Sequence, residues 1–392
     1  MRTAALLVVC AACGRFGFQD SPQDGAVATE AGVDAAPDAP TTQLTCGTPA
    51  GFDVGANQWQ TLRATGTDSG YVVVGETTGT LGGWSFGFDG TGSSALQQQV
   101  GGAVLVENAT DNANMGLAAR GDSLVLAAMI GRPDATGAQR GQFGAGLTGP
   151  SQVIVGEIPA PVALARGPGD AVAYLTANAD SELDMQLLDD TGQITGEKVF
   201  VADAAEHTGD AAIAAASGGY IAAWTENSAS PNPVRVELLD GSQATPITAG
   251  STLNQQHDES HPRVAWNAPA QRYIVTWTQK TATEGDEIWF DIRDASLTEV
   301  VVPTRAVDNG YGSKVIADAS GFLLAWGNGS SATHLGAARI SPAGAITQLT
   351  VNGSGGTAID YDVVAHDGQS AIVWAETGGS GPTLWIDALC SD

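Results

Sequence analysis

Basic residues are scarce in this chain of 392 residues. It has 16 basic residues against 43 acidic ones, which gives a net charge of −27, and only three of the basic residues are lysine. A surface this acidic repels phosphate backbones, because binding them requires basic side chains that release counterions. Nucleic acid is therefore not expected as a partner. The five histidines also leave little material for general acid–base chemistry.

A long apolar run is missing from the amino terminus. The run Ala4–Ala12 has nine residues, whereas a permanent transmembrane helix needs about 20. With Arg2 before it, the run is typical of a signal peptide over residues 1–12. Ala11-Ala12-Cys13 resembles the bacterial lipobox, although Cys10 stands where that motif has leucine. We therefore expect an exported protein with a lipid on Cys13, held at the cell envelope and most simply at the outer membrane. Simple secretion is the alternative.

Residues 13–42 lack the means to form a core. The segment Ser21–Thr42 contains no aromatic residue, no lysine and no arginine, and is rich in Ala, Asp and Pro. It cannot bury enough apolar surface to offset the entropy of ordering. We expect a flexible acidic linker at 13–42 and one folded domain at 43–392, which contacts the membrane only through the anchor.

Cysteine is also rare. Cys10 and Cys13 lie in the leader, so two of the four cysteines, Cys46 and Cys390, remain at the two ends of the folded domain. Export brings a protein into an oxidising compartment, which favours a Cys46–Cys390 disulfide. Two separate buried thiols are the alternative.

A repeat of about 50 residues fills the folded domain. Each copy has an aliphatic residue and an alanine, a short turn, and an apolar run that often ends in tryptophan, as in Ile213-Ala214 followed by GYIAAWTE. The second runs align at intervals of 52, 48, 49, 53, 49 and 48 residues. The aligned positions are Tyr71, Ser123, Ala171, Tyr220, Tyr273, Phe322 and Ser370.

Each copy continues with two more strands joined by tight turns, such as Asp240-Gly241. Four antiparallel strands per copy describe a propeller blade. The sequence therefore predicts an all-β, seven-bladed β-propeller, monomeric, with tryptophans packed between blades. The last copy ends after its third strand, and Gln43–Cys46 is expected to supply the fourth and close the ring. An open superhelical solenoid is the alternative.

The repeat resembles those of secreted and lipid-anchored bacterial β-propeller proteins, over Cys46 to the C-terminus. The shared pattern is an aliphatic residue, alanine, a glycine turn and an apolar strand closed by tryptophan, as in Val264-Ala265 with RYIVTWTQ. This resemblance implies the fold and leaves the function of the family undefined.

Loops that join one blade to the next gather around the tunnel mouth, where propellers bind ligands. We expect any ligand site there, with no catalytic residue assigned. The candidate residues are Trp59, His207, Asp210, His257, His261, Tyr311 and Asp362.

Two clusters suggest metal chemistry only weakly. His257–His261 (HDESH) superficially resembles a zinc motif, but its glutamate is one place late and a loop is expected there, so a polar loop is favoured. The acidic segment Glu284–Glu287 could attract calcium, but it lacks the alternating ligands of a calcium loop, so a solvated loop is favoured. No metal and no cofactor is therefore assigned.

The leading hypothesis is a non-enzymatic binding or scaffold protein whose partner is a protein or a carbohydrate. One alternative is an extracellular enzyme acting on a polysaccharide through carboxylates or histidines at the tunnel mouth. A purely structural envelope component is the third possibility.

Overall fold

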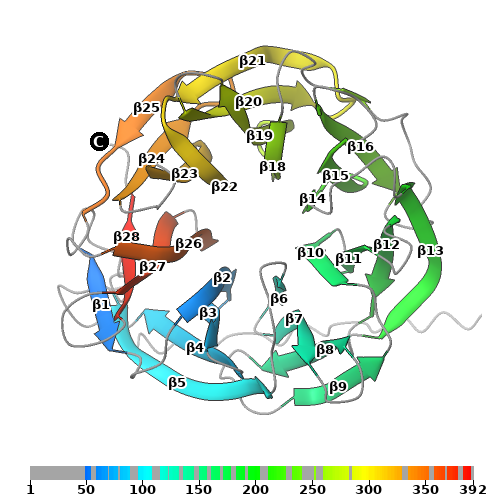
Figure 1. The fold of residues 1–392 in the computed structure, drawn as a ribbon, viewed down its shortest axis with the longest axis vertical. Helices are drawn as coiled ribbons and strands as arrows, with labels where there is room; N and C mark the ends of the chain where they lie inside the picture. Colours follow the sequence, from blue (N-terminus) through cyan, green and yellow to red (C-terminus); the bar gives the residue numbers. More distant parts are fainter. Residues whose placement is uncertain are drawn as a thin grey trace, which may run out of the picture. The chain divides into compact units, whose positions relative to one another are not determined.

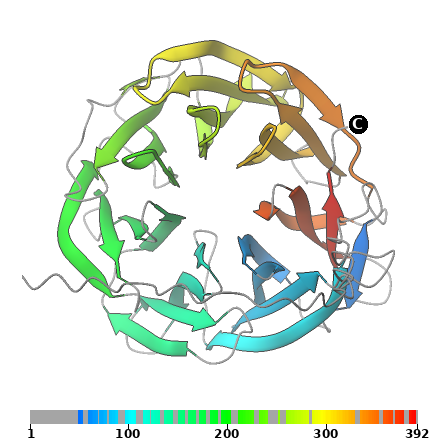
Figure 2. The same ribbon diagram turned by 180° about the vertical axis from the view of Figure 1, so that it is seen from behind.

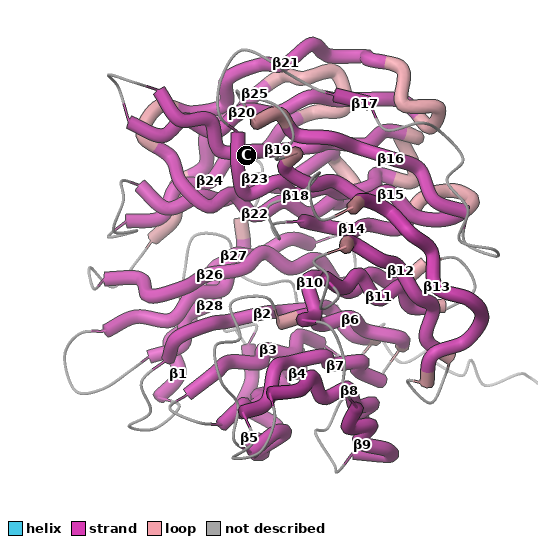
Figure 3. Tube along the Cα trace, turned by 45° about the vertical axis from the view of Figure 1, so that its right-hand side comes forward, coloured by secondary structure: helices cyan, strands magenta, loops and turns pink. Residues whose placement is uncertain are grey.

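A computed structural model describes most of the strands and few of the loops. The described residues run from 49 to 389, without 54–58, 69, 78–79, 89–95, 108–114, 122, 132–135, 145–149, 157–159, 168–170, 178–181, 190–192, 204–210, 227–231, 241–250, 253–258, 282–284, 329–333, 353–356, 367–368 and 378–382. The chain divides into two units, Met1–Pro40 and Thr41–Asp392, and every described residue belongs to the second. Regular structure in the described part consists of strands (Figure 3). Its residues include no helix able to span a membrane.

The strands form seven four-stranded antiparallel sheets. We number the sheets 1 to 7 along the chain, each from its innermost strand outward (Figure 1). Sheet 1 contains β2 (Trp59–Thr67), β3 (Gly70–Thr77), β4 (Thr80–Phe88) and β5 (Leu96–Glu107). Sheet 2 contains β6 (Gly116–Arg120), β7 (Ser123–Gly131), β8 (Thr136–Gly144) and β9 (Pro150–Gly156). Sheet 3 contains β10 (Ala160–Arg166), β11 (Val172–Ala177), β12 (Leu183–Leu188) and β13 (Ile194–Ala202). Sheet 4 contains β14 (Ala211–Ala215), β15 (Gly219–Thr225), β16 (Val234–Asp240) and β17 (Ser251–Thr252).

The later sheets follow the same order. Sheet 5 contains β18 (Glu259–Asn267), β19 (Arg272–Thr281), β20 (Gly285–Asp294) and β21 (Glu299–Val307). Sheet 6 contains β22 (Gly310–Asp318), β23 (Gly321–Asn328), β24 (His334–Ile340) and β25 (Ile346–Leu349). Sheet 7 contains β26 (Thr357–His366), β27 (Gln369–Thr377), β28 (Thr383–Ala388) and β1 (Ala50–Asp53). The expectation of an all-β fold built from four-stranded antiparallel units is confirmed.

Sheet 7 combines both ends of the described chain. Its outermost strand β1 pairs with β28, with Ala50 opposite Ile386 and Asp53 opposite Thr383. Figure 2 shows this pair from behind, as the blue strand beside the red one. The described outermost strand is Ala50–Asp53, and Gln43–Cys46, the segment expected to supply it, lies outside the described residues. At the centre, β26 of sheet 7 contacts β2 of sheet 1.

The second strand of each sheet lies where the repeat predicts it. Strand β15 is buried over its whole length, and β23 is buried except at Asn328. Both faces are covered because neighbouring sheets pack against each side, so these strands read as uninterrupted apolar runs. The rim strand β21 has no fully buried residue. This contrast explains why second strands are the most recognisable part of the repeat.

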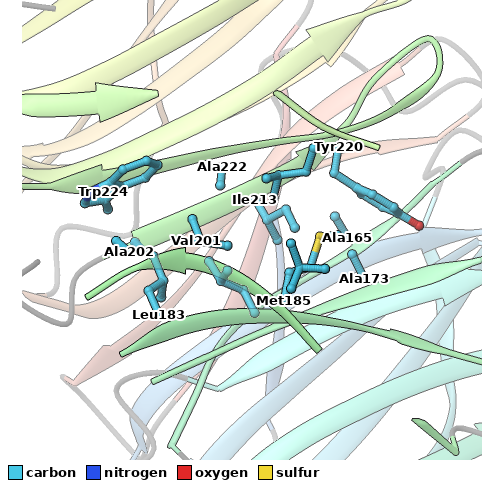
Figure 4. Close-up of a cluster of buried hydrophobic side chains, with 14 residues drawn as sticks. Ala165, Ala173, Leu183, Met185, Val201, Ala202, Ile213, Tyr220, Ala222 and Trp224 are labelled. Carbon is cyan, nitrogen blue, oxygen red and sulfur yellow. The ribbon is translucent and has the colours of Figure 1, made fainter. Parts of the chain in front are cut away.

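The expected packing of tryptophan between sheets is confirmed. Trp277 and Trp374 have exposed fractions of 0% and 1%, and Trp224 and Trp326 are 3% exposed. Trp224 belongs to a cluster that joins sheets 3 and 4 and includes Met185, Val201 and Ile213 (Figure 4).

Polar contacts also join every sheet to the next. At least one hydrogen bond that involves a side chain connects a strand of each sheet with a strand of the next sheet or with the residue flanking it. The bonds run from Arg63 Nε to Met115 O, Arg120 Nη1 to Asp189 O, Tyr220 Oη to Ala171 O, Val234 N to Glu259 Oε2, Asn267 Nδ2 to Asp318 O, Tyr361 Oη to Tyr311 O, and Leu62 N to Asp360 Oδ2. Because a buried polar group left without a partner is unfavourable, these bonds specify which sheets are neighbours.

Two buried carboxylates where sheets 6 and 7 meet have opposite environments. Asp387 is fully buried and accepts a hydrogen bond from Asn352 N at 3.1 Å, while its Oδ1 has no partner among the described residues. Burial raises the pKa of Asp387 to about 6. Asp318 is buried as well, which opposes its charge, but hydrogen bonds from Ser320 and Ser370 keep its pKa below the ordinary value.

We expect Asp387→Asn to stabilise the protein at pH 7. The folded-state pKa of Asp387 is raised, so its unfavourable effect on stability grows as the pH rises from about 4 to 6 and is complete above 6. The gain should be about 1 to 3 kcal/mol at pH 7 and should vanish near pH 4, as measured by urea unfolding at both values. Asp318→Asn is the matched control and should destabilise at pH 7. A loss of stability at pH 7 in Asp387→Asn would contradict this assignment.

Candidate functional site

One position in each innermost strand faces the same central space. Strand pairing defines this position. In each sheet it is the residue of the innermost strand that pairs with one particular residue of the second strand, the one three places after the aligned position given above. We call these residues the tunnel ring. In order of sheet they are Arg63, Leu117, Leu164, Ala212, Arg263, Lys314 and Asp362.

All seven residues of the tunnel ring line a cavity of about 160 Å³. The ring is divided into two halves by charge. Sheets 2, 3 and 4 contribute Leu117, Leu164 and Ala212, whereas sheets 5, 6, 7 and 1 contribute charged residues. Because sheet 7 contacts sheet 1 through β26 and β2, the charged residues form one continuous arc opposite the apolar residues.

Backbone irregularities precede two of the cations. The pairing of β18 shifts between Ser260 and Arg263, and that of β22 shifts between Tyr311 and Lys314. The extra residues include His261 and Gly312, both of which have positive φ, at 55° and 65°. Such bulges change the direction of the side chains that follow and are frequent next to functional sites.

The charged arc contains more positively charged side chains than negatively charged ones. Arg63, Arg263 and Lys314 stand against Asp360 and Asp362, which leaves a net charge of about +1 if all are ionised. The chain as a whole has a net charge of −27. The tunnel is therefore a local reversal of the charge of the protein.

Both carboxylates are committed to the backbone. Asp360 accepts hydrogen bonds from Leu62 N at 2.7 Å and from Tyr361 N at 2.9 Å. Asp362 accepts from Ala64 N and Val363 N, both at 2.9 Å. Strand β2 is the inner edge of its sheet, so its N–H groups need these acceptors. The two carboxylates thus connect sheet 7 to sheet 1, which leaves them poorly placed for general base chemistry.

The arginines contact main-chain carbonyls. Arg63 donates to Met115 O at 3.1 Å and Leu62 O at 2.6 Å, and its Nη1 lies 3.5 Å from Asp360 Oδ2. Arg263 donates to Pro262 O at 2.6 Å. Arg63 and Arg263 thus bring two guanidinium groups, which can donate hydrogen bonds to an anion, to the wall of the cavity.

Lys314 is the most perturbed group of the arc. Burial and the positive charges of Arg63 and Arg263 lower the pKa of its ammonium group to about 8, although Asp362 and Asp360 act in the opposite direction. Among the described residues, no hydrogen bond or ion pair to this ammonium is found. A half-buried cation beside two others is a recognised mark of a functional site.

The structure brings two of the candidate residues from the sequence together. Tyr311 Oη lies 2.9 Å from His261 Nε2, and the two rings meet edge to face with centroids 4.8 Å apart. His261 Nδ1 lies 2.9 Å from Ser260 Oγ. Tyr311 is 37% exposed. Both residues lie near the starts of innermost strands, just before Arg263 and Lys314, so the pair lies beside the charged arc.

Other candidates are placed differently from the prediction or lie outside the described residues. Asp362 was expected in a loop, but it lies within β26 and is bound to the backbone of sheet 1. Trp59 is the first residue of β2. The remaining candidates outside the described residues are Cys13, Cys46, His207, Asp210, His257 and Cys390.

The two possible metal clusters are used differently. In HDESH, Glu259 is buried and accepts a hydrogen bond from Val234 N at 2.7 Å, which gives it a structural role. Glu287 was expected in a solvated loop, but it is buried in β20 and bound by Trp289 Nε1 and Arg305 Nη1, both at 2.8 Å. The described residues contain no group of three side chains able to hold a metal ion.

Comparisons with known proteins identify the fold alone. No family model and no curated protein matches the chain. A chain of a crystal structure of the mitotic checkpoint complex is 12% identical, with a TM-score of 0.52, over 95% of this chain and 99% of that one. The WD40 β-propeller domain of Doa1 is also 12% identical, with a TM-score of 0.51, over 88% of this chain and 96% of that one. The fold is therefore that of a β-propeller, and its function must be argued from the tunnel.

Proposed function

We propose that this chain is an exported, lipid-anchored binding protein, a closed propeller of seven blades whose tunnel holds a small anion. The seven sheets, the contact of β26 with β2, and the pairing of β1 with β28 support closure. The signal-like leader and Cys13 support export and anchoring. The observation that carries the binding role is the convergence of Arg63, Arg263 and Lys314 on one cavity.

The volume of the cavity suits a small ligand. A volume of about 160 Å³ is close to that of a protein cavity known to bind benzene, about 150 Å³. Inorganic phosphate or a small organic acid fits such a space, whereas a sugar residue within a polysaccharide chain is larger. With both carboxylates committed to backbone N–H groups, the tunnel gives no support to hydrolysis of a polysaccharide.

Anion binding should weaken as the pH rises above about 8. Burial and the neighbouring arginines lower the pKa of Lys314 to about 8, so its charge is lost as the pH rises above that value. Calorimetric titration with sodium acetate and with inorganic phosphate, between pH 6.5 and 9.5, should show a dissociation constant of about 1 mM or lower at the acid end. Lys314→Arg should remove the pH dependence, because arginine stays protonated.

A matched control separates the tunnel from general electrostatics. Lys280 is an exposed lysine on β19 and does not line the cavity. Lys314→Met should weaken binding about tenfold or more, which corresponds to about 1.4 kcal/mol, while Lys280→Met should leave it unchanged. Equal effects of the two substitutions, or no binding by the unaltered protein, would overturn the proposal.

A further inference from the structure

Charged and apolar residues occupy opposite sides of the tunnel ring. The arc formed by sheets 5, 6, 7 and 1 is charged, and the arc formed by sheets 2, 3 and 4 presents only Leu117, Leu164 and Ala212. The cavity wall next to the apolar arc is extended by Met115 and Ile213. The tunnel ring therefore places charged side chains on one side of the cavity and aliphatic side chains on the other, where Leu164 also packs in a core cluster.

We propose that the natural ligand is a short aliphatic carboxylate, with its carboxylate toward Arg263, Lys314 and Arg63 and its hydrocarbon tail against Leu117 and Leu164. This inference rests on the proposed anion-binding function and specifies the class of ligand. Arginine side chains suit a carboxylate, because the guanidinium group can donate two parallel hydrogen bonds to its two oxygens.

Inorganic anions fit the ring less well. Phosphate and sulfate have oxygens on all sides, so some of them would face Leu117 and Leu164 without a donor, which is unfavourable in a partly enclosed site. An alkanoate has oxygens at one end only. Its tail removes apolar surface from water on contact with the leucines.

Cavity size limits the length of the tail. Each buried methylene contributes about 0.8 kcal/mol, which is about fourfold in affinity. A cavity of about 160 Å³ accommodates a ligand about the size of benzene. We therefore expect affinity to rise along the series acetate, propanoate, butanoate and pentanoate, and then to stop rising when the cavity is full.

The test is a calorimetric series with the sodium salts of the alkanoates from acetate to octanoate, and with inorganic phosphate, on the unaltered full chain at pH 7. We expect about fourfold tighter binding per methylene up to a maximum. Leu164→Ala enlarges the apolar side and should move the maximum to a longer acid. Leu335→Ala is the matched control, because Leu335 lies on β24 and outside the cavity lining.

The possible outcomes separate this inference from the proposed function. Anion binding with no dependence on tail length, or tighter binding of phosphate than of every alkanoate, would reject the alkanoate and leave the anion site standing. No binding of any anion would reject both. The series on the unaltered protein is decisive by itself, so the inference stays testable if Leu164→Ala does not fold.

Discussion

Lys314→Met is expected to make the protein more stable near pH 7 at the same time as it weakens the binding of anions. Burial and the charges of Arg63 and Arg263 lower the pKa of Lys314 from 10.5 to about 8. Its charged form is therefore disfavoured by folding. Methionine has a similar length and no charge, so it should relieve about 1 to 3 kcal/mol of this unfavourable energy.

The pH dependence gives the sign of the effect an independent check. The folded-state pKa is depressed, so in the unaltered protein stability from this group increases as the pH rises from about 8 toward 10.5. Urea unfolding at pH 7 and pH 10 should show the advantage of Lys314→Met at pH 7 and its decrease at pH 10. Lys280→Met should show neither. A destabilised Lys314→Met protein at pH 7 would mean that the lysine stabilises the ring, and the functional interpretation would lose its main support.

The other large effect concerns the Cys46–Cys390 disulfide, which stays a prediction because both residues lie outside the described part. The pairing of β1 with β28 strengthens it. The described strands nearest in sequence to the two cysteines are paired, with Ala50 opposite Ile386 in an antiparallel register.

Removing this disulfide should lower stability by about 5 kcal/mol on the chain-entropy model, because the loop that it closes spans nearly the whole domain. Urea unfolding of the exported protein with and without reductant measures the change. The double variant Cys46→Ser, Cys390→Ser should be as unstable as the reduced protein, and reductant should not change its stability further. Intact mass spectrometry of the protein from native membranes should show the loss of two hydrogens and a diacylglyceryl group at Cys13. Free thiols and an unmodified Cys13 would remove the case for export.

The repeat was readable from the sequence for a physical reason. A second strand such as β15 is covered on both faces, so every residue from Gly219 to Thr225 is buried. Apolar runs of this kind recur at nearly constant spacing and need no knowledge of the register. The sequence therefore predicted correctly that Tyr220 and Trp224 lie on the second strand of their sheet.

The charged arc was missed because its members have no common sequence context. The recurrent alanine is 8 residues before the aligned second-strand position in the copy with Ala265 and 5 residues before it in the copy with Ala317. Differences in the bulges and hairpin turns shift one copy against another. Aligned on alanine, Arg263 and Lys314 occupy different places, whereas strand pairing puts both at one position.

The tie between sheets 7 and 1 has a thermodynamic consequence for the tunnel. Asp360 and Asp362 hold the N–H groups of Leu62 and Ala64, on either side of Arg63. The two ends of the folded chain meet in the same sheet as these carboxylates. Separation of sheets 7 and 1 would move the groups around Arg63 apart, so binding at the proposed anion site and contact between these sheets are thermodynamically linked. Any solute that binds there should increase the free energy needed to separate sheets 7 and 1, by an amount that depends on its concentration relative to its dissociation constant.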